Sequence, residues 1–175
     1  MAAESVVTSP VAARREASDT SGVYAEGMLA GTVGAVTIAL WFLILDTIAG
    51  RPFYTPNVVG TALLRAGKGL AAPEALPISL EVVLPFTWIH LLVFLLIGVA
   101  ASRLLALAER NASFGFGVLL LFVVFEFGFL LASLVVAAPV LEALAWPAVL
   151  VGNLLAAAAM TAVFWRRHPQ LAIYP

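Results

Sequence analysis

The chain has 175 residues, of which 63% are hydrophobic and only 11% are charged. Its mean hydropathy of +1.07 lies far above that of soluble globular domains and indicates an integral membrane protein. Nine Lys and Arg residues balance ten Asp and Glu residues, so no broad basic surface for nucleic acid is expected. The absence of cysteine excludes disulfides, thiolate metal sites, iron–sulfur clusters and a cysteine nucleophile.

Long uncharged runs locate the expected membrane spans. A helix that crosses a hydrocarbon core of about 30 Å needs about 20 mainly apolar residues. The charge spacing predicts four such helices, at about 24–48, 83–107, 114–138 and 143–165. We therefore expect an all-α polytopic membrane protein in which residues 23–168 form a bundle of four transmembrane helices.

Two tails flank this expected bundle. Residues 1–22 are small, polar and aperiodic, which predicts a disordered tail rather than a cleaved signal peptide, and 169–175 form a short C-terminal tail. An even number of spans puts both tails on one side, with six arginines there and three basic residues on the other. The positive-inside rule then favours cytoplasmic termini. The alanine runs and the preference for Arg over Lys favour the bacterial inner (plasma) membrane.

The long loop between the first two spans contains a helical pattern. Thr55 and Pro56 read as an N-cap followed by proline at the first helical position, and apolar residues then recur at helical spacing as far as Gly67. This predicts a short amphipathic helix at about 56–66. We expect it to lie flat at the outer interface, held by Phe53 and Tyr54; a re-entrant dip into the membrane is the alternative.

Glu126 is the one ionisable residue inside the expected span at 114–138. A carboxylate near the middle of the membrane costs roughly 2.5 to 3.5 kcal/mol on insertion scales, so it must face protein or water. The functional interpretation is a carboxylate that carries a proton or cation, or that anchors a ligand. The structural alternative is a protonated side chain that hydrogen-bonds a neighbouring helix.

Three further polar residues could join Glu126 in an intramembrane cluster. His90 lies within the second span, Asp46 ends the first, and Asn153 lies within the fourth. If the helices are neighbours, Asp46 could orient the imidazole and Asn153 could reach His90 or Glu126. Each also has an ordinary structural interpretation, as a solvated helix end, an interfacial histidine and an interhelical hydrogen bond respectively.

Small residues recur at four-residue spacing on two of the expected spans, a pattern typical of faces where helix backbones approach closely in lipid. These helix-packing residues are Gly27, Gly31, Gly34 and Ala35 in the first span, and Gly152 and Ala156 in the fourth. Such faces serve packing within one chain, or they dock a second copy or another membrane subunit.

The sequence lacks the motifs of several specific chemistries. It has no His-Glu-x-x-His, no Glu-x-x-His repeat, no P-loop and no G-x-S-x-G, so we expect no metal, no cofactor and no catalytic residue. The first hypothesis is a non-catalytic accessory or interaction subunit of a larger membrane assembly. The alternative is a small oligomeric transporter or channel that moves protons or cations through Glu126. A third is a membrane enzyme or redox protein that acts on a lipid or quinone, with His90 and Asp46 as its acid–base pair.

Overall fold

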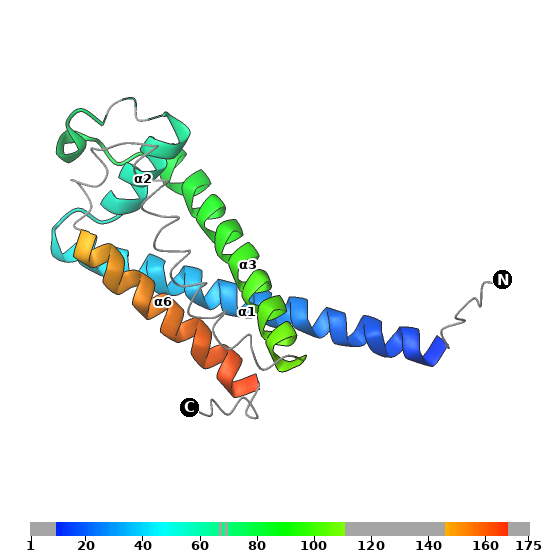
Figure 1. Cartoon of the computed structure of the whole chain (residues 1–175). Helices are drawn as coiled ribbons and strands as arrows, with labels where there is room; N and C mark the ends of the chain where they lie inside the picture. Colours follow the sequence, from blue (N-terminus) through cyan, green and yellow to red (C-terminus); the bar gives the residue numbers. More distant parts are fainter. Residues whose placement is uncertain (1–9, 67, 69, 111–145, 168–175) are drawn as a thin grey trace.

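A computed structural model describes residues 10–66, 68, 70–110 and 146–167. All regular structure in these ranges is helical: α1 (Pro10–Ile48), α2 (Tyr54–Leu64), a 3-10 turn η1 (Pro73–Ala75), α3 (Leu80–Arg110) and α6 (Trp146–Arg167) (Figure 1). The expectation of a helical membrane protein is confirmed, because three helices are long and apolar enough to cross a membrane: Ser21–Ile48, Leu80–Ala106 and Trp146–Arg167. The predicted span at 114–138, with Glu126, lies outside the described residues.

Helix α1 starts earlier than the sequence suggests. It begins at Pro10, whereas residues 1–22 were expected to form a disordered tail. Proline suits a first helical position, alanine, arginine and glutamate follow it, and extending an existing helix costs far less than nucleating one. At 1.5 Å per residue the 39 residues span about 58 Å, nearly twice the hydrocarbon thickness. Figure 1 shows the N-terminal part of α1 projecting beyond α3 and α6.

Helices α1 and α3 pack antiparallel with their backbones in close contact. A Cβ atom at Gly27 would lie 2.5 Å from Cα of Val99, and one at Gly31 would meet the backbone carbonyl of Phe94. Gly98 in turn faces both glycines. A four-residue repeat on both helices is typical of close crossings built on small residues. Four pairs define the register: Val23 with Ser102, Gly27 with Gly98, Gly31 with Phe94, and Ala35 with His90.

Helix α6 packs on another side of α1, also antiparallel. Trp41 donates a hydrogen bond of 2.8 Å from Nε1 to the carbonyl of Ala148. A Cβ atom at Gly152 would lie 2.8 Å from the Trp41 ring, and further along the pair Gly34 meets the Met160 side chain. Both α3 and α6 therefore run opposite to α1. We call the end that carries α2 the loop end, and the end that carries Arg103, Arg166 and Arg167 the basic end.

Helix α2 is packed into the loop end. Val58 and Ala62 are buried in a cluster with Tyr54, Leu70 and Val149. Of the two aromatic residues expected to hold the helix at the interface, Tyr54 is 8% exposed and Phe53 is 45% exposed. Phe53 adopts a left-handed conformation (φ 67°) at the N-cap of α2.

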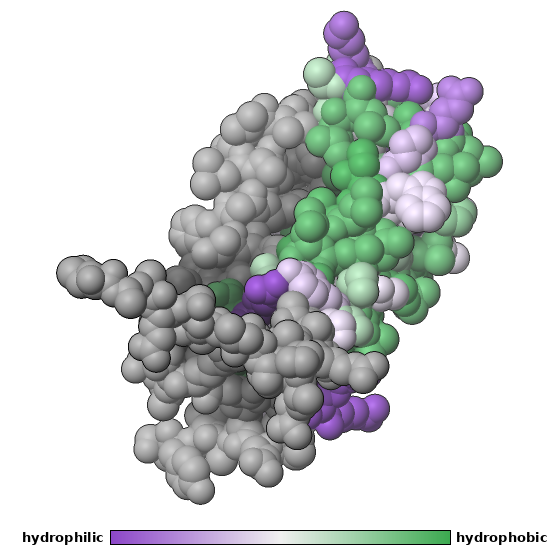
Figure 2. All heavy atoms as spheres, turned by 90° about the vertical axis from the view of Figure 1, so that its right-hand side faces the viewer, coloured by the Kyte–Doolittle hydropathy of each residue, from purple (hydrophilic) through white to green (hydrophobic). Residues whose placement is uncertain are grey.

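The outer surface agrees with contact with a lipid bilayer. Figure 2 shows a face on which a broad apolar band lies between hydrophilic residues at its two ends. Within the most apolar window of each span, only 17% to 22% of the residues are buried. The three helices therefore direct most of their apolar surface outward, as lipid contact requires.

Candidate functional site: polar contacts within the helix bundle

Asp46 joins the end of α1 to the start of α2. Its carboxylate accepts two hydrogen bonds of 2.8 Å from Thr55, one from the backbone N–H and one from the hydroxyl. Both residues are buried, at 5% and 8% exposed. Thr55 is thus not the N-cap that the sequence suggests: Phe53 holds that position and offers no side-chain hydrogen bond. The carboxylate of Asp46 satisfies a first-turn N–H in its place, where the helix dipole favours negative charge.

The turn between α1 and α2 is set by backbone hydrogen bonds. Gly50 donates to Thr47 O and Arg51 donates to Asp46 O, with Gly50 at φ 72°. This is a glycine C-cap, in which carbonyl groups at the end of α1 accept hydrogen bonds and the chain reverses direction. The Arg51 guanidinium lies 4.0 Å from the centroid of the Tyr54 ring. Asp46 therefore sits in a fixed corner and contributes both its carbonyl and its carboxylate to it.

Asn57 fixes the chain that leads into α3. Its amide nitrogen donates to Pro77 O at 3.1 Å, and its oxygen accepts from the N–H of Ser79 at 3.0 Å. The side chain is 1% exposed. Asn57 was not among the residues expected to matter, although an asparagine within an apolar helical run was the available signal.

His90 lies between α1 and α3. Its Nε2 atom is 3.2 Å from the carbonyl oxygen of Ala35, so that nitrogen is the donor in this contact. Phe86 and Phe94, one turn to either side, place their ring centroids 6.0 and 4.8 Å from the imidazole. The imidazole therefore links the two helices through a backbone carbonyl, in aromatic surroundings.

Three of the four residues of the predicted polar cluster, Asp46, His90 and Asn153, lie in the part of the chain that the structure describes. Asp46 is bonded to Thr55, and His90 is bonded to Ala35, which lies eleven residues earlier on α1, or about 16 Å along its axis. The structure thus places Asp46 and His90 at different levels and does not bring them together. Asn153 is half-buried on α6, next to the glycine that contacts Trp41. Glu126 lies outside the described residues.

The basic end holds polar contacts that the sequence analysis missed. Ser102 donates a 2.8 Å hydrogen bond to the carbonyl of Val23. Glu26, in the adjoining turn of α1, is only 6% exposed. Glu26 falls inside the span expected at about 24–48 but was not among the residues singled out from the sequence. Here too Arg103 donates a hydrogen bond to the hydroxyl of Tyr24.

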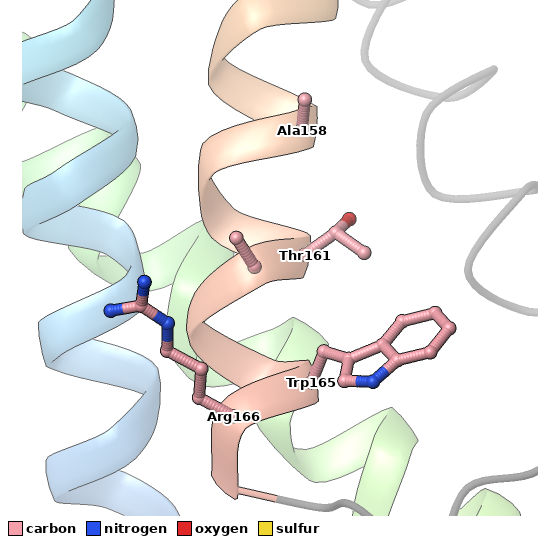
Figure 3. Close-up of a pocket in the computed structure, with 5 residues that line it drawn as sticks. Ala158, Thr161, Trp165 and Arg166 are labelled. Atoms are coloured by element: carbon pink, nitrogen blue, oxygen red, sulfur yellow. The ribbon is translucent and has the colours of Figure 1, made fainter.

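An open groove of about 510 Å³ runs beside the second half of α6. Its described lining residues are Ala158, Thr161, Ala162, Trp165 and Arg166. Figure 3 shows Trp165 and Thr161 projecting to one side of α6 and Arg166 to the other. The hydroxyl of Thr161 bonds the carbonyl of Ala157 within its own helix. The groove thus presents an apolar surface and no pair of groups suited to acid–base chemistry among these residues.

The polar groups described above act mainly on the backbone of the chain itself. Asp46, Asn57, His90 and Ser102 each contact a main-chain atom of another segment. Within the part of the chain that the structure describes, no group of three or more His, Asp or Glu side chains could hold a metal ion. This arrangement stabilises the positions of the helices.

Comparison with known proteins adds no relative. No protein-family model matches the chain, and no curated protein and no solved structure is significantly similar to it.

Proposed function

We propose that the protein is a non-catalytic accessory or interaction subunit of a larger membrane assembly. The observation that carries this proposal is the use of the buried polar side chains. Asp46, Asn57 and His90 bind main-chain groups of neighbouring segments, which fixes the helices but offers no paired acid and base. A rigid bundle with small aqueous segments suits lateral contact with other membrane proteins.

The outward face of α3 is the surface best suited to such contact. It carries a row of large apolar side chains at four-residue spacing, exposed by 55% to 72%: Leu84, Trp88, Leu92 and Leu96. In lipid, helices associate through close packing rather than through a hydrophobic driving force, so a straight apolar ridge with one tryptophan offers a shape to pack against. The glycine face of α1 already packs against α3, so it is not available to a partner.

Four spans with cytoplasmic termini are part of the same proposal. Because α3 and α6 both run opposite to α1, the chain has to return across the bundle between them. A fourth span at about 114–138 supplies that crossing. Arg103, Arg166 and Arg167 lie at one end, which supports placing that end in the cytoplasm of a bacterial inner membrane.

Native mass spectrometry of the protein, extracted gently from its own membrane at natural abundance, tests the subunit proposal. We expect recovery with other polypeptides in defined ratio. The double substitution Leu92→Ala and Leu96→Ala should release them, while Val36→Ala with Leu40→Ala, on the exposed face of α1, should not. Recovery of the chain alone, as multiples of 18.4 kDa, would overturn the proposal.

The buried carboxylate of Glu26 favours one second candidate, a small proton- or cation-coupled transporter that uses Glu126. An ionisable side chain within a span is costly and most often lies on an ion pathway. Here Glu26 is enclosed at the basic end of α1. Under this alternative, Glu126→Gln abolishes a pH-dependent flux in reconstituted vesicles and Glu26→Gln slows it. Unchanged flux in Glu126→Gln would eliminate Glu126 as the carrier.

A further inference from the structure

The basic end of the bundle carries a guanidinium that an aromatic ring holds in place. Arg103 on α3 lies over the ring of Tyr24 on α1, with its central carbon 4.4 Å from the ring centroid. The same guanidinium donates a hydrogen bond to the Tyr24 hydroxyl. Both side chains are exposed, so the pair is accessible from outside the protein. The contact bridges the two most closely packed helices and restricts the rotamers of an otherwise mobile arginine.

A guanidinium restricted in this way is suited to binding phosphate. It has five N–H donors in a planar fork that matches two phosphate oxygens, and Tyr24 engages one N–H group. Because stacking on the ring fixes the plane of the fork, less conformational entropy is lost when an anion binds. Arg166 and Arg167 end α6 at the same end of the bundle and add positive charge.

The position of Arg103 and Tyr24 along the helices favours the phosphate of a lipid headgroup. Arg103 lies toward the end of the α3 span, and the exposed Tyr24 and Trp165 are aromatic rings of the type found at headgroup level. Toward the membrane interior, one or two turns away, lie Met28, which is 47% exposed, and Leu96, which is 72% exposed. A cation at headgroup depth therefore borders an exposed apolar surface, which acyl chains can contact.

We propose that Arg103 and Tyr24 form a binding site for the phosphate headgroup of an anionic phospholipid. The lipid's acyl chains lie along the surface of Met28 and Leu96. Lipids with net negative charge are preferred over zwitterionic ones, because Arg103 attracts the phosphate but repels a headgroup ammonium. The site does not rest on the accessory-subunit function proposed above, but its apolar part shares Leu96 with the α3 face offered there to a partner.

Native mass spectrometry of the purified full chain tests the site, with dioleoylphosphatidylglycerol and dioleoylphosphatidylcholine as the two probes. Wild type should retain phosphatidylglycerol in preference. Arg103→Gln should weaken phosphatidylglycerol binding about fivefold, the effect of one arginine near a lipid surface. Arg65→Gln is the matched control, because it removes an exposed arginine at the loop end, and its binding should equal that of wild type.

Equal retention of the two lipids by wild type would overturn the proposal, as would wild-type binding in Arg103→Gln or an equal loss in Arg65→Gln. Glycerol 3-phosphate should not compete, since a lipid needs the apolar surface as well; full competition would show that a soluble phosphate is the ligand. If Arg103→Gln does not fold, Arg103→Lys serves instead. It keeps the charge but loses the planar fork, so binding as tight as wild type would overturn the role of the guanidinium.

Discussion

Asp46 and Thr55 share two hydrogen bonds of 2.8 Å each, and through them the last turns of α1 hold the first turn of α2. A carboxylate from a different helix thus caps α2, because the residue at its own N-cap, Phe53, has no side-chain acceptor. Burial strengthens the contact, since the carboxylate and the helix N-terminus interact with little competition from water.

Removing this carboxylate should loosen α2. We expect Asp46→Ala to lower the free energy of unfolding by roughly 2 to 4 kcal/mol, because two hydrogen bonds to a charged acceptor are lost and a buried N–H is left unsatisfied. Thr55→Val removes only the hydroxyl bond and should cost about 1 kcal/mol. Unfolding in mixed micelles, followed by tryptophan fluorescence, measures both values.

Thr47→Ala is the control for these two variants. Thr47 is exposed and its hydroxyl bonds only Leu43 O in the same helix, so its loss should change stability by less than about 0.5 kcal/mol. In the double variant of Asp46 and Thr55 the two losses should be clearly non-additive. Simple additivity would show that the two side chains act independently and would contradict the cap.

The glycine contact between α1 and α3 predicts a graded series of alanine substitutions. Gly31→Ala should destabilise by roughly 1 to 3 kcal/mol, because its Cβ meets the backbone of Phe94, which cannot move alone. Gly34→Ala should cost less, since its Cβ meets side-chain atoms of Met160 and Phe94 rather than backbone. Gly22 has nothing within 4 Å, so Gly22→Ala should be neutral or slightly stabilising. Equal unfolding free energies for the three variants in the same assay would contradict the close crossing of α1 and α3.

A substitution at Gly50 measures the cost of backbone conformation separately from the cost of packing. A side chain there would meet open space, but the residue holds φ 72°. Gly50→Ala should therefore cost about 1 to 2 kcal/mol, the strain of an L-residue in the left-handed region. Hydrogen exchange should report the loss first at the N–H groups of Gly50 and Arg51. Wild-type stability in this variant would mean that the turn can adopt another form.

His90→Leu separates a structural role of the imidazole from a chemical one. It keeps the side-chain bulk but removes the bond to Ala35 O, so a loss of about 0.5 to 1 kcal/mol is expected, as for other interhelical bonds in membranes. Thr87→Val, which removes a bond within α3 only, is the control. If a turnover assay on lipid or quinone showed activity that His90→Leu abolished with its fold intact, the acid–base hypothesis would replace the structural one.

The sequence was sufficient to predict that the chain is helical and that three of its segments are long and apolar enough to cross a membrane. Hydrophobic length and charge spacing are local properties of the chain. It also pointed to Gly27 and Gly31, whose four-residue spacing places them on one helix face. It did not supply their partner: Gly98 and Ser102 also stand at four-residue spacing in the second span, but nothing in the sequence says which helix faces the first.

The tertiary structure decided what each polar group binds. Asp46 and His90 were recognised as unusual from their positions, yet the sequence suggested that they meet each other, while the fold gives them Thr55 and Ala35. Glu26 was not among the residues singled out from the sequence, and the fold buries it. The physical reason is register: hydrogen-bond partners and burial depend on which turns of two antiparallel helices face each other, and that follows from packing across the bundle rather than from either helix alone.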